Sequence, residues 1–170
     1  EITTRQGERL TCPVSSTGGS PDEFEVVGSI PLPPGLALSE TTGCITGTAL
    51  AEGSFAATIR ARNAGGTAEA VFRVAVLPLD PEVAYVPQPA QYRVLQPVKL
   101  EPVLNAGPVS EFSLSHTSPP LPVGLALDAV TGVISGVAKQ PTHTDTYTIC
   151  ARNRAATVLA PVVISVLPLA

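Results

Sequence analysis

Few residues of this chain could take part in chemistry, and they are scattered along it. Its two histidines, His116 and His143, lie in the polar, proline-bearing stretches "LSHTSPP" and "PTHTDT". A metal site from His143 and Asp145 is the alternative to solvated loop residues, and we favour the loop interpretation. The sequence motifs of serine hydrolases, zinc proteases and nucleotide-binding loops do not occur. We therefore expect no enzyme activity, no catalytic residues and no cofactor.

Two pairs of carboxylates are the remaining candidates for a metal site. Asp22 and Glu23 begin a predicted strand, whereas Asp80 and Glu82 lie between two similar halves of the chain. Calcium requires about six to eight oxygen ligands, and the acidic clusters typical of cadherin junctions are missing. We therefore expect no metal at either pair.

Composition indicates which elements must carry these residues. The chain has 18 prolines and 14 glycines among 170 residues, and 44% of the residues are hydrophobic. Proline at this density is incompatible with long helices, while the apolar fraction is sufficient for a core. The sequence therefore predicts an all-β protein with many turns.

The charge pattern excludes two classes of partner. Charged residues make up 14% of the chain and the net charge is −4. A nucleic-acid-binding protein would show a basic patch, and none is present. No apolar run reaches the ~18–20 residues that span a bilayer, so we expect no membrane insertion in this segment.

One phrase of the sequence occurs twice. The stretch "LPPGLALSETTGCITGTA" begins at Leu32, and "LPVGLALDAVTGVISGVA" begins at Leu121, 89 positions later. "TIRARN" and "TICARN" follow at an offset of 90, as do "VAVLPL" and "ISVLPL". Such a repeat indicates two copies of one module. We place the first domain at 1–79, a proline-bearing linker at 80–84 and the second domain at 85–170.

Each copy reads as a series of short strands separated by turn residues. In the first copy, alternation and β-branched residues predict strands over 7–14, 22–28, 35–39, 44–49, 53–63 and 67–77. Short strands at this spacing favour a β-sandwich of Ig-like size. Within the repeated phrase, Leu36 and Leu38 should share the core face. Gly43 should take positive φ in a turn, and Gly47 should permit a bulge or a close backbone approach.

The stretch "LPPGLALSETTGCITGTALAEGSFAATIRARNAGG" resembles an Ig-like repeat family of extracellular, cadherin-like tandem modules. The family motif runs L-P-x-G-L-x-(L/I), then T-G-x-I-x-G-T-P, then a strand that ends in A-x-N. Ala49 and Ala138 stand where the family has proline, and "NRAAT" replaces the usual Asn-x-Gly-Gly turn in the second copy. The resemblance implies modules of surface, adhesive or wall-associated proteins without catalytic residues.

The three cysteines fit no zinc-binding spacing. The second copy has Pro102 and Val133 at the positions assigned to Cys12 and Cys44. Joint loss is expected of a bonded pair, so Cys12 and Cys44 are candidates for a disulfide, with two buried thiols as the alternative. Cys150 then has no cysteine left to pair with in the chain, which suggests an intermolecular bond or a free thiol. Paired cysteines in a small sandwich favour an oxidising, extracellular compartment.

The last hairpin of each copy has an outer face, and this face differs between the copies. A turn at 63–66 places Arg60 opposite Glu69 as a cross-strand ion pair and directs Ala68 and Ala70 toward the core. A shift of 90 residues gives an outward set in the second copy that includes Cys150, Leu159, Pro161 and Val163. An apolar outer face suggests packing against another domain or chain. The alternative is a few scattered apolar surface residues.

These features favour a structural or adhesive module of a longer extracellular array, acting as a strut and a protein–protein interaction surface in a cell-surface or filament assembly. The ending "SVLPLA" repeats the start of the linker, so we expect a further module to follow. Neighbouring Ig-like domains and other chains, further copies of this one among them, are the expected partners. Runs such as "SHTSPPLP" could carry O-linked sugars. The alternative function is a carbohydrate-binding or spacer module of a secreted enzyme, which would favour exposed aromatic residues.

Overall fold

A computed structural model describes residues 1–169 of the chain. It divides into two compact units, Glu1–Pro78 and Leu79–Ala170. Every regular element of the described residues is a β-strand, which confirms the predicted all-β class. No helix long and apolar enough to cross a membrane occurs in the described part of the chain.

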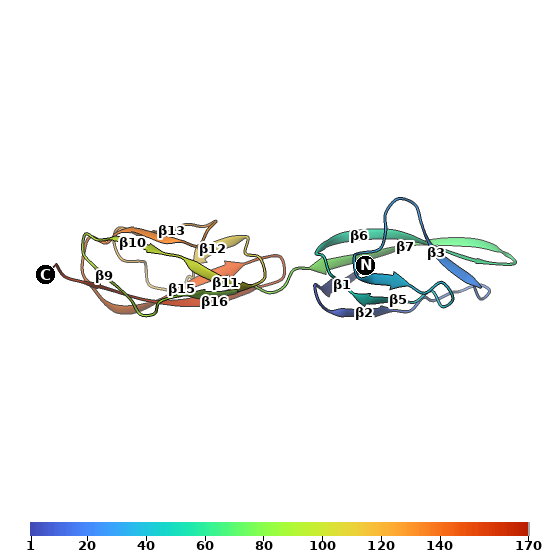
Figure 1. Ribbon diagram of the computed structural model, residues 1–170, viewed down its shortest axis with the longest axis horizontal. Coiled ribbons are helices and arrows are strands. Elements are labelled where there is room, and N and C mark those ends of the chain that lie inside the picture. Colours follow the sequence, from blue (N-terminus) through green and yellow to red (C-terminus); the bar gives the residue numbers. More distant parts are fainter. Residues whose placement is uncertain (170) are drawn as a thin grey trace. The chain divides into compact units, whose positions relative to one another are not determined.

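The first unit is a β-sandwich of two sheets (Figure 1). One sheet has the order β1-β7-β6-β3 and the other the order β2-β5-β4. The strands are β1 (Ile2–Arg5), β2 (Arg9–Cys12), β3 (Glu23–Val27), β4 (Leu36–Leu38), β5 (Ile45–Thr48), β6 (Gly53–Asn63) and β7 (Gly66–Leu77). Strand β1, which the sequence pattern did not predict, runs parallel to β7.

The second unit repeats this arrangement and adds a strand pair. Its sheets have the orders β12-β15-β16-β9 and β10-β14-β13, and β8 pairs with β11. The strands are β8 (Glu82–Tyr85), β9 (Ala90–Arg93), β10 (Pro97–Leu100), β11 (Pro102–Ala106), β12 (Glu111–Leu114), β13 (Leu125–Leu127), β14 (Ile134–Val137), β15 (Thr142–Arg152) and β16 (Thr157–Leu167). Strand β8 takes up residues 82–84 of the linker predicted at 80–84. The second unit begins at Leu79.

The pairing of β2 and β10 corrects one equivalence drawn from the sequence. Cys12 lies opposite Ile45, and Leu100 lies opposite Ile134, the counterpart of Ile45. Leu100, and not Pro102, is therefore the counterpart of Cys12. The offset between the units is 88 residues in these N-terminal strands, because the segment that follows them is one residue longer in the second unit.

The repeated phrase folds as predicted in both units. Leu36 is buried and Leu38 half-buried, and both pack against the core of the first unit. Gly43 has φ +68°, and a Cβ there would lie 2.6 Å from the Phe24 ring. At Gly47 a Cβ would collide with the backbone carbonyl oxygen of Gly35. The two glycines are therefore needed for the turn and for the close approach of β4 and β5.

The two units differ in how their cores are filled. The second unit has one continuous cluster, in which Tyr85, Phe112, Tyr147 and Ile149 are buried together. In the first unit the buried residues form two smaller clusters, one around Phe24 and one around Val74. Strand β8 contributes Tyr85 to the larger core, and no strand among residues 1–78 corresponds to it.

Candidate functional site: an outer sheet face and a cleft

The hairpin registers predicted from the sequence are confirmed in both units. In the first unit Arg62 faces Thr67 and Arg60 faces Glu69 across β6 and β7. In the second unit Cys150 faces Leu159 across β15 and β16. The two outer faces can therefore be compared residue by residue.

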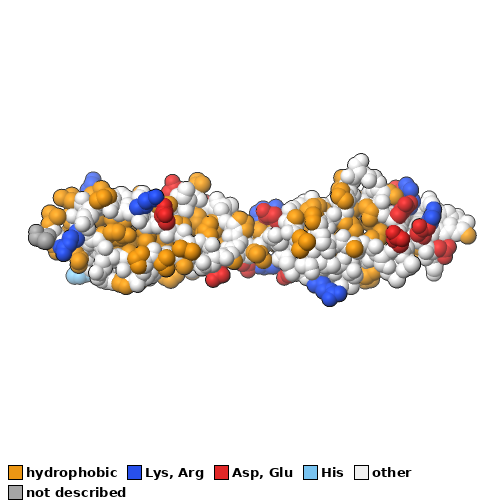
Figure 2. All heavy atoms as spheres, in the orientation of Figure 1, with side chains coloured by type: hydrophobic (Ala, Val, Ile, Leu, Met, Phe, Trp, Pro, Cys, Tyr) orange, Lys and Arg blue, Asp and Glu red, His pale blue; other side chains and the backbone are white. Residues whose placement is uncertain are grey.

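The outer face of the first unit carries a row of ion pairs. Arg60 lies between Glu25 on β3 and Glu69 on β7, with N–O distances of 3.1 and 2.8 Å. Arg62 pairs with Glu23 in the next row. The hydrogen bond from Arg60 to Glu69, and to a smaller extent the one to Glu25, raises the pKa of the arginine. Figure 2 shows charged side chains of both signs gathered over the end of the first unit that holds β3 and the β6–β7 turn.

The same row in the second unit has no charge. Ser113, Cys150 and Leu159 lie side by side at the positions of Glu25, Arg60 and Glu69. The side chain of Leu159 is 62% exposed. Only the adjacent row keeps an ion pair, between Arg152 and Glu111 at 3.9 Å. Charge is lost from this row and also at Val163, the counterpart of Arg73, while the Arg152–Glu111 pair remains.

The other two predicted interface residues extend the apolar surface around Leu159. Pro161 is exposed and lies opposite Thr148, whereas Val163 is half-buried and lies opposite Thr146. All four predicted residues thus lie on β15 and β16 of one sheet. Cys150 is half-buried beside Leu159, so its thiol belongs to the same surface.

The two cysteines of the first unit lie close together without facing each other directly. Cys12 is opposite Ile45, so Cys44 is one residue away from the facing position. Both are half-buried thiols in the structure. The disulfide between them stays a prediction.

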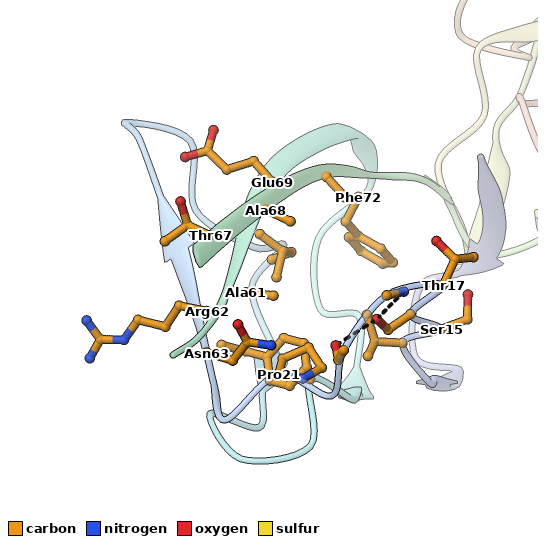
Figure 3. Close-up of a pocket in the computed structure, with 18 of the residues that line it drawn as sticks. Ser15, Thr17, Pro21, Ala61, Arg62, Asn63, Thr67, Ala68, Glu69 and Phe72 are labelled. Carbon is orange, nitrogen blue, oxygen red and sulfur yellow. Dashed lines mark hydrogen bonds between the residues drawn. The ribbon is translucent and has the colours of Figure 1, made fainter. Parts of the chain in front are cut away.

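A cleft of about 920 Å³ opens the first unit at the end of the β6–β7 hairpin. Figure 3 shows Phe72 and Ala68 of β7 facing the cleft together with Ala61 of β6, while Arg62 and Glu69 point away from it. The opposite wall is the irregular segment 13–19, which includes Ser15 and Thr17. Backbone and small side chains therefore line much of the cleft.

Sequence reasoning missed this cleft because alternation alone placed Ala68 and Ala70 inside the core. Both are exposed, whereas their counterparts in the second unit, Val158 and Ala160, are half-buried and buried. The signal that could have revealed the difference is the segment "EVAY" at Glu82–Tyr85, which has no match within residues 1–78.

The chemically capable residues do not assemble into a site. His116 is exposed in a turn, as predicted, whereas His143 is exposed but lies within strand β15, so the loop prediction is wrong for His143. Among the residues described, no group of three or more histidine, cysteine, aspartate or glutamate side chains is placed to hold a metal ion. Tyr85 and Tyr147 are buried and Tyr92 is half-buried, so the tyrosines form no exposed platform on which a sugar ring could stack.

The family model described as "Putative Ig domain" matches the chain twice, at residues 1–77 and 79–166. These two matches coincide closely with the two structural units. No curated protein resembles the chain closely enough in sequence to count as a relative.

Solved structures of tandem Ig domains resemble the chain in fold. The N-terminal four Ig domains of Dscam1 isoform 6.9 match with a TM-score of 0.61 and 10% identity, over 98% of this chain and 43% of that one. A variant of titin domains I67–I69 matches with a TM-score of 0.57 and 20% identity, over 100% and 63%. The chain thus spans less than half of the Dscam1 fragment, and identities this low indicate the fold alone.

Proposed function

Because the chain belongs to the family described as "Putative Ig domain", we propose that it is a non-enzymatic structural or adhesive part of a longer extracellular array. Each module acts as a strut, and the second also presents a protein–protein interaction surface. The tandem of two Ig-like sandwiches supports the first statement. The second depends on the outer face of the second unit.

The observation that carries the proposal is the apolar row at Cys150 and Leu159. The equivalent row of the first unit holds an arginine between two glutamates, so the fold itself does not require apolar residues there. An apolar side chain left 62% exposed gains stability when a partner removes it from water, by roughly 25 cal/mol per Å² buried. We infer that another chain in a surface or filament assembly, either a second copy or a different protein, covers this face.

Light scattering on the intact chain tests the proposal, with and without reductant. We expect a multimer that Leu159→Glu and Val163→Glu disrupt, because a charge placed in an apolar contact must be desolvated. Cys150→Ser tells whether a thiol link adds to the contact. Val130→Glu is the matched control, since Val130 is a more exposed valine, at 77%, away from the face. If the multimer survives both face substitutions, the proposed interface is wrong.

The mass of the secreted protein tests two further parts of the proposal. A Cys12–Cys44 disulfide lowers the intact mass by the mass of two hydrogen atoms, and reduction restores it. O-linked sugars on the Ser/Thr/Pro-rich loop around His116 would raise the mass by whole sugar units. A mass equal to that of the unmodified, reduced sequence would contradict both modifications.

A further inference from the structure

The walls of the cleft in the first unit have counterparts on every side in the second. Ala68 and Phe72 of β7 correspond to Val158 and Val162 of β16, which have the same register in their hairpin. On the opposite wall, the offset of 88 relates the irregular segment 14–18 to strand β11. The two regions are therefore built to the same plan, yet only one of them is open.

Strand β8 closes this region in the second unit. Ala84 pairs with Val103 of β11, and β8 also contacts β16. Tyr85 is 1% exposed, and its hydroxyl group donates a hydrogen bond to the carbonyl oxygen of Gly132 at 2.7 Å. After the strand, the side-chain amide of Gln88 donates to the carbonyl oxygen of Pro161 at 2.8 Å.

The first unit has counterparts of the residues that surround β8. Gly43 lies against the ring of Phe24 as Gly132 lies against the ring of Phe112, and Gly43 lines the cleft. Cys12, the counterpart of the buried Leu100, also lines it and is half-buried. Val71, the counterpart of Pro161, is 51% exposed. A strand in the position of β8 would cover Gly43 and Cys12, whereas the side chain of Val71 would stay exposed as that of Pro161 does.

We propose that the cleft of the first unit is an acceptor site for an extended strand of the β8 type, supplied by the linker of a preceding module. The strand pairs with residues 14–18, as β8 pairs with β11, and places a tyrosine over Phe24. Its hydroxyl group donates to the carbonyl oxygen of Gly43. This inference rests on the array part of the proposed function, because the second unit takes its own β8 from the segment that follows the first unit.

A graft onto the complete chain tests the inference. Ile2 and Ala90 hold equivalent places in their pairing with β7 and β16, so residues 80–88, "DPEVAYVPQ", are added directly before Glu1. The control carries the same graft with its tyrosine replaced by alanine. Hydrogen exchange is followed at residues 14–18 and 67–71, and alkylation of Cys12 in the reduced protein is followed by mass spectrometry.

We expect the tyrosine graft to slow amide exchange at both segments by about tenfold relative to the alanine graft, because paired, buried amides open less often. Alkylation of Cys12 should slow in parallel. Equal exchange in the two grafted chains would overturn the inference. Protection of the same residues that rises with concentration in the ungrafted chain would also overturn it, since a second copy would then be the occupant.

The outcome is separable from that of the proposed function. The graft leaves Cys150 and Leu159 unchanged, so loss of assembly in the face variants and failure of the graft are independent results. A graft that fails while assembly persists would refute the strand acceptor alone.

Discussion

The two units share their hairpin registers and their turn phrase but differ in closure and in surface charge. Gly43 and Gly132 make the same turn against Phe24 and Phe112. The second unit is closed by Tyr85 and has an uncharged outer row, whereas the first is open and has a charged one. The difference teaches that turn geometry and alternation carry this fold, while the charge on one outer face can vary without altering it.

Replacing Tyr85 should produce the largest effect and make the second unit resemble the first. Tyr85→Ala removes a fully buried aromatic side chain, and we expect it to lower the free energy of unfolding of the second unit by about 3–5 kcal/mol. All three tyrosines of the chain lie in the second unit, so tyrosine fluorescence during urea denaturation reports on that unit. Tyr85→Phe should cost only about 1 kcal/mol, for the lost hydrogen bond. Equal losses in the two variants would mean that the packing of Tyr85 contributes little.

The turn glycines should show what the units have in common. Gly43→Ala and Gly132→Ala each force an alanine to positive φ and place a Cβ within 2.7 Å of a phenylalanine ring. We expect each to destabilise its own unit by about 2–3 kcal/mol. For Gly43→Ala the loss should appear in circular dichroism and not in tyrosine fluorescence. A loss in only one of the two variants would show that the shared phrase is not equally strained.

Alkaline pH should distinguish the closed unit from the open one. Burial raises the pKa of Tyr85 from 10.0 to about 12. Between these values the unfolded chain loses the phenolic proton while the folded chain keeps it. The stability that is present below pH 10 is therefore lost as the pH rises toward 12, by about 2 kcal/mol.

The dependence is measured as the difference in urea stability between the unmodified chain and Tyr85→Phe, followed by circular dichroism. This difference should shrink and change sign as the pH rises from 9 to about 12. A constant difference would show that the Tyr85 hydroxyl group stays accessible to water.

Exchanging the outer rows should have the smallest effect on stability. Cys150→Arg with Leu159→Glu recreates in the second unit the pair that Arg60 and Glu69 form in the first. An exposed cross-strand pair contributes about 0.2–1 kcal/mol. A double-mutant cycle measured by tyrosine fluorescence gives this value, and it should decrease in high salt. A coupling that salt does not weaken would not be an ion pair.

Much of the fold could be predicted from the chain alone. The positions of Leu36 and Gly43 and the pairing of Arg60 with Glu69 follow from local alternation and turn chemistry, which act over a few neighbouring residues. The outward placement of Cys150 and Leu159 follows from the same register. Strand β1 escaped prediction because its pairing with β7 joins residues more than 70 positions apart.

By itself, then, the sequence determined the repeat, the sandwich class and the outer row of the second unit, since these depend on periodicity and on short-range turns. Only the tertiary structure decided which inward positions are covered. Ala70 and Ala160 share the same alternation, but burial depends on whether a distant strand lies over them. Tyr85 lies over this region in the second unit through contacts with β11 and Gly132, and long-range contacts of this kind leave no periodic signal along the chain.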